Sequence, residues 1–215
     1  MLDAATGTVL EWHSISYQQF LSDVERVAQY WLHRLSEAGI THRSVIGLWY
    51  VTFLVPATTM MFMFNNFRLG GMAYTDVVHV YAVARAGYIP QLFSLRLPNP
   101  EVIYELMDKA NAQALIFDTS SNCSFEGAPV PTYPATSHDS IRPVCAQRLP
   151  PILENVTGED IFCIFHTSGS TSGIPKVIPC SFAWLDNIIA KADFLCRRRS
   201  PDRQDVTTWV YVFPS

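Results

Sequence analysis

The sequence has few charged residues and lacks the composition of a disordered or nucleic-acid-binding chain. Charged residues make up 16% of its 215 residues, whereas a typical domain has about 25%. Apolar residues make up 49%, which is sufficient to build a packed core. The net charge of −4 provides no general attraction to nucleic acid or to anionic lipid. Intrinsic disorder and nucleic-acid partners are therefore excluded.

Cysteine and histidine show no metal-binding or disulfide pattern. The five cysteines contain no C-x-x-C pair, and the six histidines have no ligand spacing with one another or with the cysteines. The first residues, MLDAATGTVLEWHS, lack a basic segment followed by a long apolar run. A secretory signal is therefore not expected. Together these absences favour a reducing compartment and predict a cytoplasmic protein.

Segments of helical periodicity alternate with short apolar runs along most of the chain. Helices are expected over 17–38, 75–86, 100–110 and 182–199, and strands over 45–49, 88–92, 114–117, 161–165 and 176–178. Residues 119–158 are rich in proline and are expected to form an irregular connection. Pro90 suggests that its strand lies at a sheet edge or that the residue lies at a strand end. The alternation predicts an α/β fold with a parallel-rich sheet and flanking helices.

The segment IFCIFHTSGSTSGIPKVIP, residues 161–179, is where the sequence indicates chemistry. A buried strand is followed by glycines, which permit close backbone approach, and by several hydroxyl donors. Consecutive N–H groups in such a loop form a nest for anions, and Lys176 adds a cation. This combination suits a polyphosphate, although the spacing is not that of a Walker A loop. A plain hydroxyl-rich surface loop is the alternative.

Single polar residues elsewhere give weaker signals. His166 precedes the loop and is predicted to pack there, with a catalytic base as the alternative. Asp76 and His79 lie three residues apart on an expected helix and are predicted to occupy a solvated face. Trp31 and Trp184 are expected to contribute packing.

The segment TSGSTSGIPK resembles the phosphate-binding loop of the adenylate-forming enzymes, whose usual form is TSG[ST]TGxPK, with Ser172 as one extra residue. This family includes acyl-CoA synthetases, luciferases and nonribosomal peptide adenylation domains. The resemblance extends to SYQQF at 16–20, ARAGYIP at 84–90 and LPNPEVIYEL at 97–106. The sequence of these segments most resembles that of fungal proteins that join adenylation, carrier and reductase domains.

The resemblance implies ATP-dependent activation of a carboxylic acid to an acyl-adenylate, with Mg²⁺ as cofactor. The residues that it implies for nucleotide binding are Thr167, Ser168, Gly169, Ser170, Thr171, Ser172, Gly173 and Lys176. No catalytic residue and no protein metal ligand is assigned, and the identity of the acid is not indicated. Phosphopantetheine would be carried only by a carrier domain, which is expected to lie outside this chain, as would a reductase domain.

By the same resemblance, residues 1–215 are expected to form an incomplete N-terminal subdomain of the adenylation domain. The family's later motifs and C-terminal lid would follow residue 215, so the chain is expected to be inactive alone. Two alternatives remain: a non-catalytic nucleotide-binding or interaction module, and a membrane-anchored remnant that uses the uncharged residues 45–66.

Residues 50–68 form an apolar insertion between GLW and LGG, segments that the family pattern would join directly. Trp49 requires the codon TGG, and Tyr-Val can follow as TATGT, which together give a donor-like TG|GTATGT. Phe67-Arg68 can supply an acceptor-like TTCAG|G. We hypothesise that the insertion is a retained in-frame intron. A cDNA read that contains codons 50–68 in every transcript would contradict this hypothesis.

Overall fold

The computed structural model describes residues 14–49, 74–93, 99–118, 125, 127–142, 148–151, 156–167 and 175–196. In chain order its elements are α1 (Tyr17–Glu37), β1 (Val45–Trp49), α3 (Tyr74–Arg85), β2 (Ile89–Phe93), α4 (Pro100–Lys109), β3 (Ala112–Phe117), β4 (Thr132–Pro134), the 3-10 helix η1 (His138–Ser140), β5 (Ile161–His166), β6 (Val177–Ser181) and α5 (Phe182–Cys196).

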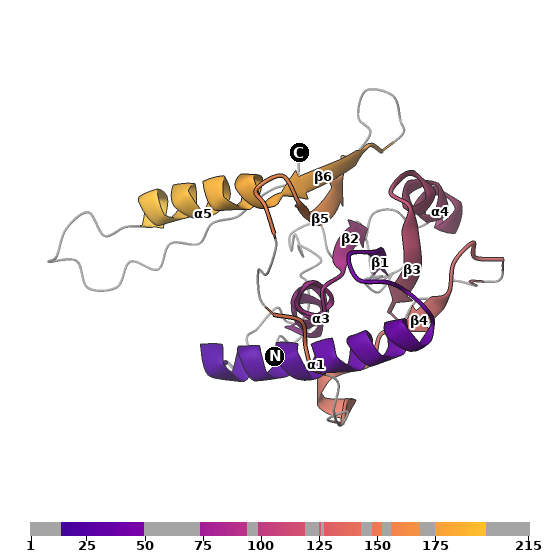
Figure 1. Cartoon of the computed structure of the whole chain (residues 1–215), viewed down its shortest axis with the longest axis horizontal. Coiled ribbons are helices and arrows are strands. Elements are labelled where there is room, and N and C mark those ends of the chain that lie inside the picture. Colours follow the sequence, from indigo (N-terminus) through magenta and orange to yellow (C-terminus); the bar gives the residue numbers. More distant parts are fainter. Residues whose placement is uncertain are drawn as a thin grey trace, which may run out of the picture.

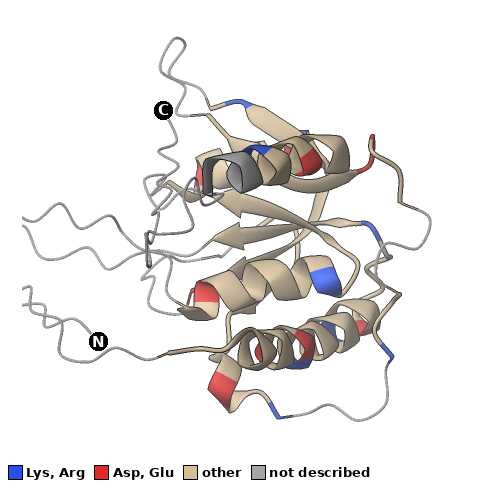
Figure 2. Ribbon diagram, turned by 90° about the vertical axis from the view of Figure 1, so that its left-hand side faces the viewer, with Lys and Arg blue, Asp and Glu red and all other residues tan. Residues whose placement is uncertain are grey.

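The strands form one six-stranded sheet in the order β4-β3-β1-β2-β5-β6 (Figure 1). β1 lies inside the sheet, in parallel pairing with β2 on one side and β3 on the other. β5 and β4 extend the parallel arrangement, whereas β6 runs antiparallel to β5. The described strands contain no charged residue, and the charges lie on helices and connections (Figure 2). The predicted α/β fold with a parallel-rich sheet and flanking helices is confirmed.

One face of the sheet is covered by α1 and α3 (Figure 1). Side chains of a strand alternate between its two faces, so Ile46 and Leu48 of β1 point to these helices together with Ile116 of β3. They are buried with residues from both helices, which include Val24, Val27, Ala28, Trp31, Leu35, Val78, Ala82 and Val83. Burying each large apolar side chain here contributes about 1.5–3 kcal/mol to stability.

The opposite face is covered by α4. Its buried side chains pack against the other set of strand residues, and this core contains Trp49, Phe93, Ile103, Leu106, Met107, Ala112 and Leu115. Gly47 leaves the space that this packing requires. A Cβ atom at Gly47 would lie 3.0 Å from Leu115 Cδ1 and 3.0 Å from Phe93 Cε2. The close approach of α4 to β1 therefore depends on the absence of a side chain at this position.

The starts of α1 and α4 are fixed by side-chain caps. Ser16 Oγ accepts a hydrogen bond from the Gln19 amide at 3.1 Å, and Asn99 Oδ1 accepts one from the Glu101 amide at 2.9 Å. Each such cap contributes about 1 kcal/mol. α5 is described as far as Cys196, and the rest of the predicted helix, 197–199, lies outside the described residues.

Pro90 occupies an interior strand, so the expectation of a sheet edge is wrong, although the residue does lie near the start of β2. The amide of Ile89 donates to Ser44 O, towards β1, at 3.0 Å. Because successive backbone groups of a strand point to opposite sides, the nitrogen of Pro90 faces β5. The described register with β5 is Gln91↔Ile164. Pro90 therefore has no N–H to donate towards β5, while the pairing of β2 with β1 is kept.

The proline-rich connection contains regular structure that the sequence does not indicate. β4 pairs in parallel with β3 through Leu115↔Thr132 and the next two residues, and η1 follows it. A three-residue strand is too short to show a periodic pattern, and its neighbours in the sequence are prolines. The expectation of a wholly irregular segment is corrected here.

His79 is fully buried, so its predicted place on a solvated helix face is wrong. Trp31 Nε1 donates to His79 Nδ1 at 2.8 Å, and His79 Nε2 lies 2.9 Å from Thr136 O, to which it donates. Burial lowers the pKa of His79 to about 4, which keeps the ring neutral. The predicted packing role of Trp31 is confirmed.

The apolar run at 45–66 begins inside the sheet. Residues 45–49 are β1, hydrogen-bonded to strands on both sides, which corrects the interpretation of the whole run as a membrane span. The remainder, including the insertion at 50–68, lies outside the described residues. Within the described ranges, no helix combines the length and apolarity needed to cross a bilayer.

Candidate nucleotide-binding site

The predicted phosphate loop, defined as residues 167–176, follows the carboxyl end of β5. Because β5 is parallel to β2, and β2 is parallel to β1, these strands end at the same edge of the sheet (Figure 2). Ligands of open α/β sheets bind at the carboxyl ends of the strands. The fold therefore brings the base of the loop, Thr167 and Lys176, to the edge where a ligand site is expected.

The base of the loop is closed by two hydrogen bonds between its first and last residues. The Thr167 amide donates to Lys176 O at 3.1 Å, and the Lys176 amide donates to Thr167 Oγ1 at 3.0 Å. These bonds extend the β5–β6 ladder by one step beyond His166↔Val177. Thr167 and Lys176 are the predicted site residues that the structure places. Ser168, Gly169, Ser170, Thr171, Ser172 and Gly173 lie outside the described residues.

Lys176 lies at the base of the loop, where a ligand can reach its side chain. Its side chain is exposed, and no acidic side chain of the described residues forms an ion pair with it. The preceding Pro175 is buried, which anchors the lysine backbone against the protein. A fixed backbone with a free ammonium group suits the binding of phosphate oxygens.

His166, the residue before the loop, is held by contacts on several sides. Its ring stacks on Phe93 with centroids 4.9 Å apart. Nδ1 lies 2.9 Å from Leu92 O, and Nε2 lies 3.1 Å from the side-chain nitrogen of Gln91. Partial burial lowers the pKa of His166. Both ring nitrogens are occupied, so the packing role predicted for His166 is favoured over a catalytic base.

Gln91 is the residue at this edge that the sequence analysis missed. It is completely buried in β2 and donates to Leu106 O of α4 at 2.9 Å as well as to His166. Its Oε1 atom is buried with no partner among the described residues. The available signal was an amide side chain inside the apolar strand IPQLF, where an uncompensated polar group is costly.

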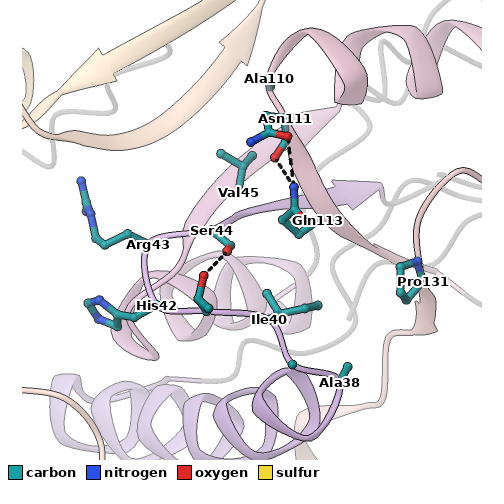
Figure 3. Close-up of a pocket in the computed structure, with 12 residues that line it drawn as sticks. Ala38, Ile40, His42, Arg43, Ser44, Val45, Ala110, Asn111, Gln113 and Pro131 are labelled. Carbon is teal, nitrogen blue, oxygen red and sulfur yellow. Dashed lines mark hydrogen bonds between the residues drawn. The ribbon is translucent and has the colours of Figure 1, made fainter.

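The described residues also enclose a hollow of about 640 Å³, but at the opposite edge of the sheet (Figure 3). Residues 38–45, 110, 111, 113 and 131 line it, where α1 and α4 end and β1 begins. Helix C-termini present carbonyl oxygens and carry partial negative charge. Neither Thr167 nor Lys176 lines this hollow, so the carboxyl edge remains the candidate site.

No group of three or more His, Cys, Asp or Glu side chains in the described part of the chain is arranged to hold a metal ion. The groups available at the loop base are a hydroxyl, backbone amides and the Lys176 ammonium. Such groups bind phosphate oxygens, and Mg²⁺ at such sites is carried largely by the phosphates themselves.

Comparison with known proteins gives the same family that the loop resembles. No family profile matches the chain. The AMP-binding domain-containing enzyme iboA of Amanita muscaria is 32% identical over 174 residues, which cover 79% of this chain and 30% of the relative. The chain contains part of an adenylate-forming domain.

Solved structures of adenylate-forming domains share its fold. O-succinylbenzoate coenzyme A synthetase (MenE) of Bacillus subtilis, in complex with AMP, superimposes with a TM-score of 0.60 at 14% identity, covering 88% of this chain and 42% of MenE. A nonribosomal peptide synthetase superimposes with a TM-score of 0.53 at 12% identity, covering 86% of this chain and 16% of that protein. The chain therefore spans less than half the length of these relatives.

Proposed function

We propose that this chain supplies the phosphate-binding loop for ATP-dependent activation of a carboxylic acid. In this reaction a carboxylate oxygen attacks the α-phosphorus of ATP and the bond between the α- and β-phosphates breaks. The products are an acyl-adenylate and pyrophosphate. The observation that carries the proposal is the closure of the segment TSGSTSGIPK by Thr167 and Lys176 at the carboxyl edge of a parallel sheet.

The loop acts by positioning and charge neutralisation. Its N–H and hydroxyl groups hold the β- and γ-phosphates, and the Lys176 ammonium offsets the charge that develops on the leaving pyrophosphate. Magnesium, bound with the nucleotide, supplies further neutralisation of that charge. The residues assigned to these contacts are Thr167, Ser168, Gly169, Ser170, Thr171, Ser172, Gly173 and Lys176.

The complete activity is assigned to the whole adenylation domain. A structure of MenE that contains ATP and a magnesium ion superimposes on 86% of this chain and 42% of MenE, with a TM-score of 0.57. This likeness supports the same ligands here. Carrier and reductase domains are proposed as partners that receive the activated acyl group, and the cytoplasm is the proposed location.

A nucleotide-binding module without catalysis is the second candidate. The observation that supports it is the closed loop base, which provides for phosphate binding and by itself requires no turnover. The two candidates agree on phosphate binding and differ on turnover.

The test measures binding and turnover on the same purified chain. MgATP and magnesium pyrophosphate are titrated calorimetrically, and ATP–pyrophosphate exchange is assayed with a panel of carboxylic acids, with and without the C-terminal remainder of the fungal relative. Lys176→Met is expected to weaken MgATP binding about tenfold because it removes a charge-assisted hydrogen bond.

Lys109→Met is the matched control. Lys109 pairs with Glu105 at 2.6 Å on the exposed surface of α4, so its loss should leave MgATP affinity unchanged. Exchange activity, alone or after complementation, supports the enzyme. Binding without exchange in both arms supports the module, and the absence of binding rejects the proposed site.

A further inference from the structure

The carboxamide of Gln91 uses both of its N–H groups inside the protein. One donates to Leu106 O in the last turn of α4 at 2.9 Å, and the other donates to His166 Nε2 at 3.1 Å. A rotated amide would place its oxygen against Leu106 O, where two acceptors repel each other. The carbonyl of α4 therefore fixes which end of the amide faces the histidine.

This orientation also fixes the protonation of His166. Leu92 O is only an acceptor, so the ring proton is on Nδ1. Nε2 must then present its lone pair to the N–H of Gln91. A second ring proton would point at that N–H group, so the amide holds the ring in the neutral Nδ1–H form.

The position of the ring matters because His166 contacts β2 at the end of β5 that leads into the loop. The described register between these strands is the single pair Gln91↔Ile164. Beyond that pair, the side chain of His166 adds a link from β5 to β2 through Leu92 O and the ring of Phe93. The next residue is Thr167, which closes the loop with Lys176.

We propose that Gln91 is a positioning residue for the phosphate loop: its amide holds the His166 ring in one tautomer and so keeps Thr167 in register with Lys176. The inference rests on the proposed function only for the identity of the ligand. Because Gln91 is completely buried, its proposed role is to position other residues and not to contact the ligand.

The first test is Gln91→Met, which keeps the length of the side chain and removes both donors. Without them, the ring ¹⁵N shifts of His166 should show a mixture of tautomers and a pKa that moves towards 6.5. Exchange of the Thr167 and Lys176 amide protons should become about tenfold faster, and MgATP binding about tenfold weaker. Unchanged tautomer and unchanged exchange would overturn the proposal.

The control is Ile103→Ala, which removes buried side-chain atoms from the same core without touching His166. It should lower global stability and leave the tautomer of His166 intact. The double variant Gln91→Met/His166→Phe replaces the polar pair by an apolar one. Its loss of stability should be smaller than the sum of the two single losses, because the two residues act through each other. Strict additivity would count against the coupling.

The outcomes separate this inference from the proposed function. If the wild-type chain binds neither MgATP nor magnesium pyrophosphate, while Gln91→Met still alters the tautomer and the amide exchange, the ligand assignment fails and the positioning role stands. If the wild type binds MgATP and Gln91→Met binds it equally well with unchanged exchange, the positioning role fails and the ligand assignment stands.

Discussion

Two histidines on opposite faces of the sheet, His79 and His166, are each held neutral by one side-chain N–H donor and one backbone carbonyl. The two rings differ in which nitrogen accepts and which donates. His79 accepts a side-chain hydrogen bond at Nδ1 and donates to a backbone carbonyl from Nε2. His166 donates to a backbone carbonyl from Nδ1 and accepts a side-chain hydrogen bond at Nε2. One carbonyl and one N–H donor are therefore enough to select a tautomer, with the proton on Nε2 in His79 and on Nδ1 in His166.

The two histidine rings differ in their burial and in the segments of the chain that they connect. His79 is fully buried and joins α1, α3 and the segment after β4 through Trp31 and Thr136. His166 is half-buried and joins β5 to β2, one residue before the phosphate loop. The first arrangement holds the core of a layer together, whereas the second fixes the start of a functional segment. The predictions below test this division.

Removing the partner of the fully buried histidine should have the largest effect. Trp31→Ala is expected to cost about 3–5 kcal/mol of unfolding free energy because it leaves a cavity and removes the buried hydrogen bond to His79. Trp184, which is 44% exposed on α5, is the matched control, and Trp184→Ala should cost less than about 1 kcal/mol. Urea unfolding followed by far-UV circular dichroism measures both. Equal losses would contradict the assignment of Trp31 to the core.

The two histidines should also differ in their effect on acid stability. The pKa of His79 is lowered to about 4 in the folded protein, while the unfolded ring titrates near 6.5. Between these values the unfolded state binds the extra proton, so stability should fall as the pH is lowered from 6.5 to 4, by at most about 1.4 kcal/mol per pH unit. The pKa values of Asp23 and Asp160 are lowered below 3.8, so these carboxyl groups titrate below this window.

Urea unfolding at several pH values tests this contribution. His79→Phe should flatten the slope between pH 6.5 and 4, and His166→Phe should flatten it less because that ring is only half-buried. His33→Phe is the control, since His33 lies exposed beside Glu37. An unchanged slope in His79→Phe would contradict the neutral buried ring.

A substitution at Gly47, on the face of the sheet that α4 covers, should alter the environment of the His166 ring through Phe93. Gly47→Ala is expected to cost about 1–3 kcal/mol because its Cβ would lie 3.0 Å from Phe93 and Leu115. Phe93 stacks on His166, so the ring ¹⁵N shifts of His166 should change too. Gly39→Ala is the control: its φ of +76° costs about 1–2 kcal/mol with no atom within 4 Å, and His166 should be unaffected.

The sequence predicts most of the fold because the signals are local. The caps at Ser16 and Asn99 and the apolar run at 45–49 set element boundaries that the structure reproduces. β4 was not predictable, because three residues among prolines carry no period. The burial of His79 was missed because it depends on a partner 48 residues away in the chain.

The candidate site shows the same limit. The loop motif was visible from residue types at fixed spacing, and its closure by Thr167 and Lys176 agrees with it. The part played by Gln91 was not visible, because it arises only when β2, β5 and α4 meet in space. Long-range polar contacts of this kind leave at most a trace in the sequence, here one amide inside an apolar strand.

The smallest expected effect concerns Cys163 and Cys180, which face each other across β5 and β6 and are both buried. Burial raises the pKa of both thiols, so iodoacetamide should modify them at least about tenfold more slowly than an exposed cysteine. Peptide mass spectrometry after timed alkylation measures each site separately. If β5 and β6 open locally more often than the layer of α1 and α3 that contains His79, the two cysteines will be alkylated faster than the whole protein unfolds. Modification at the global unfolding rate would show instead that both histidines belong to one cooperative unit.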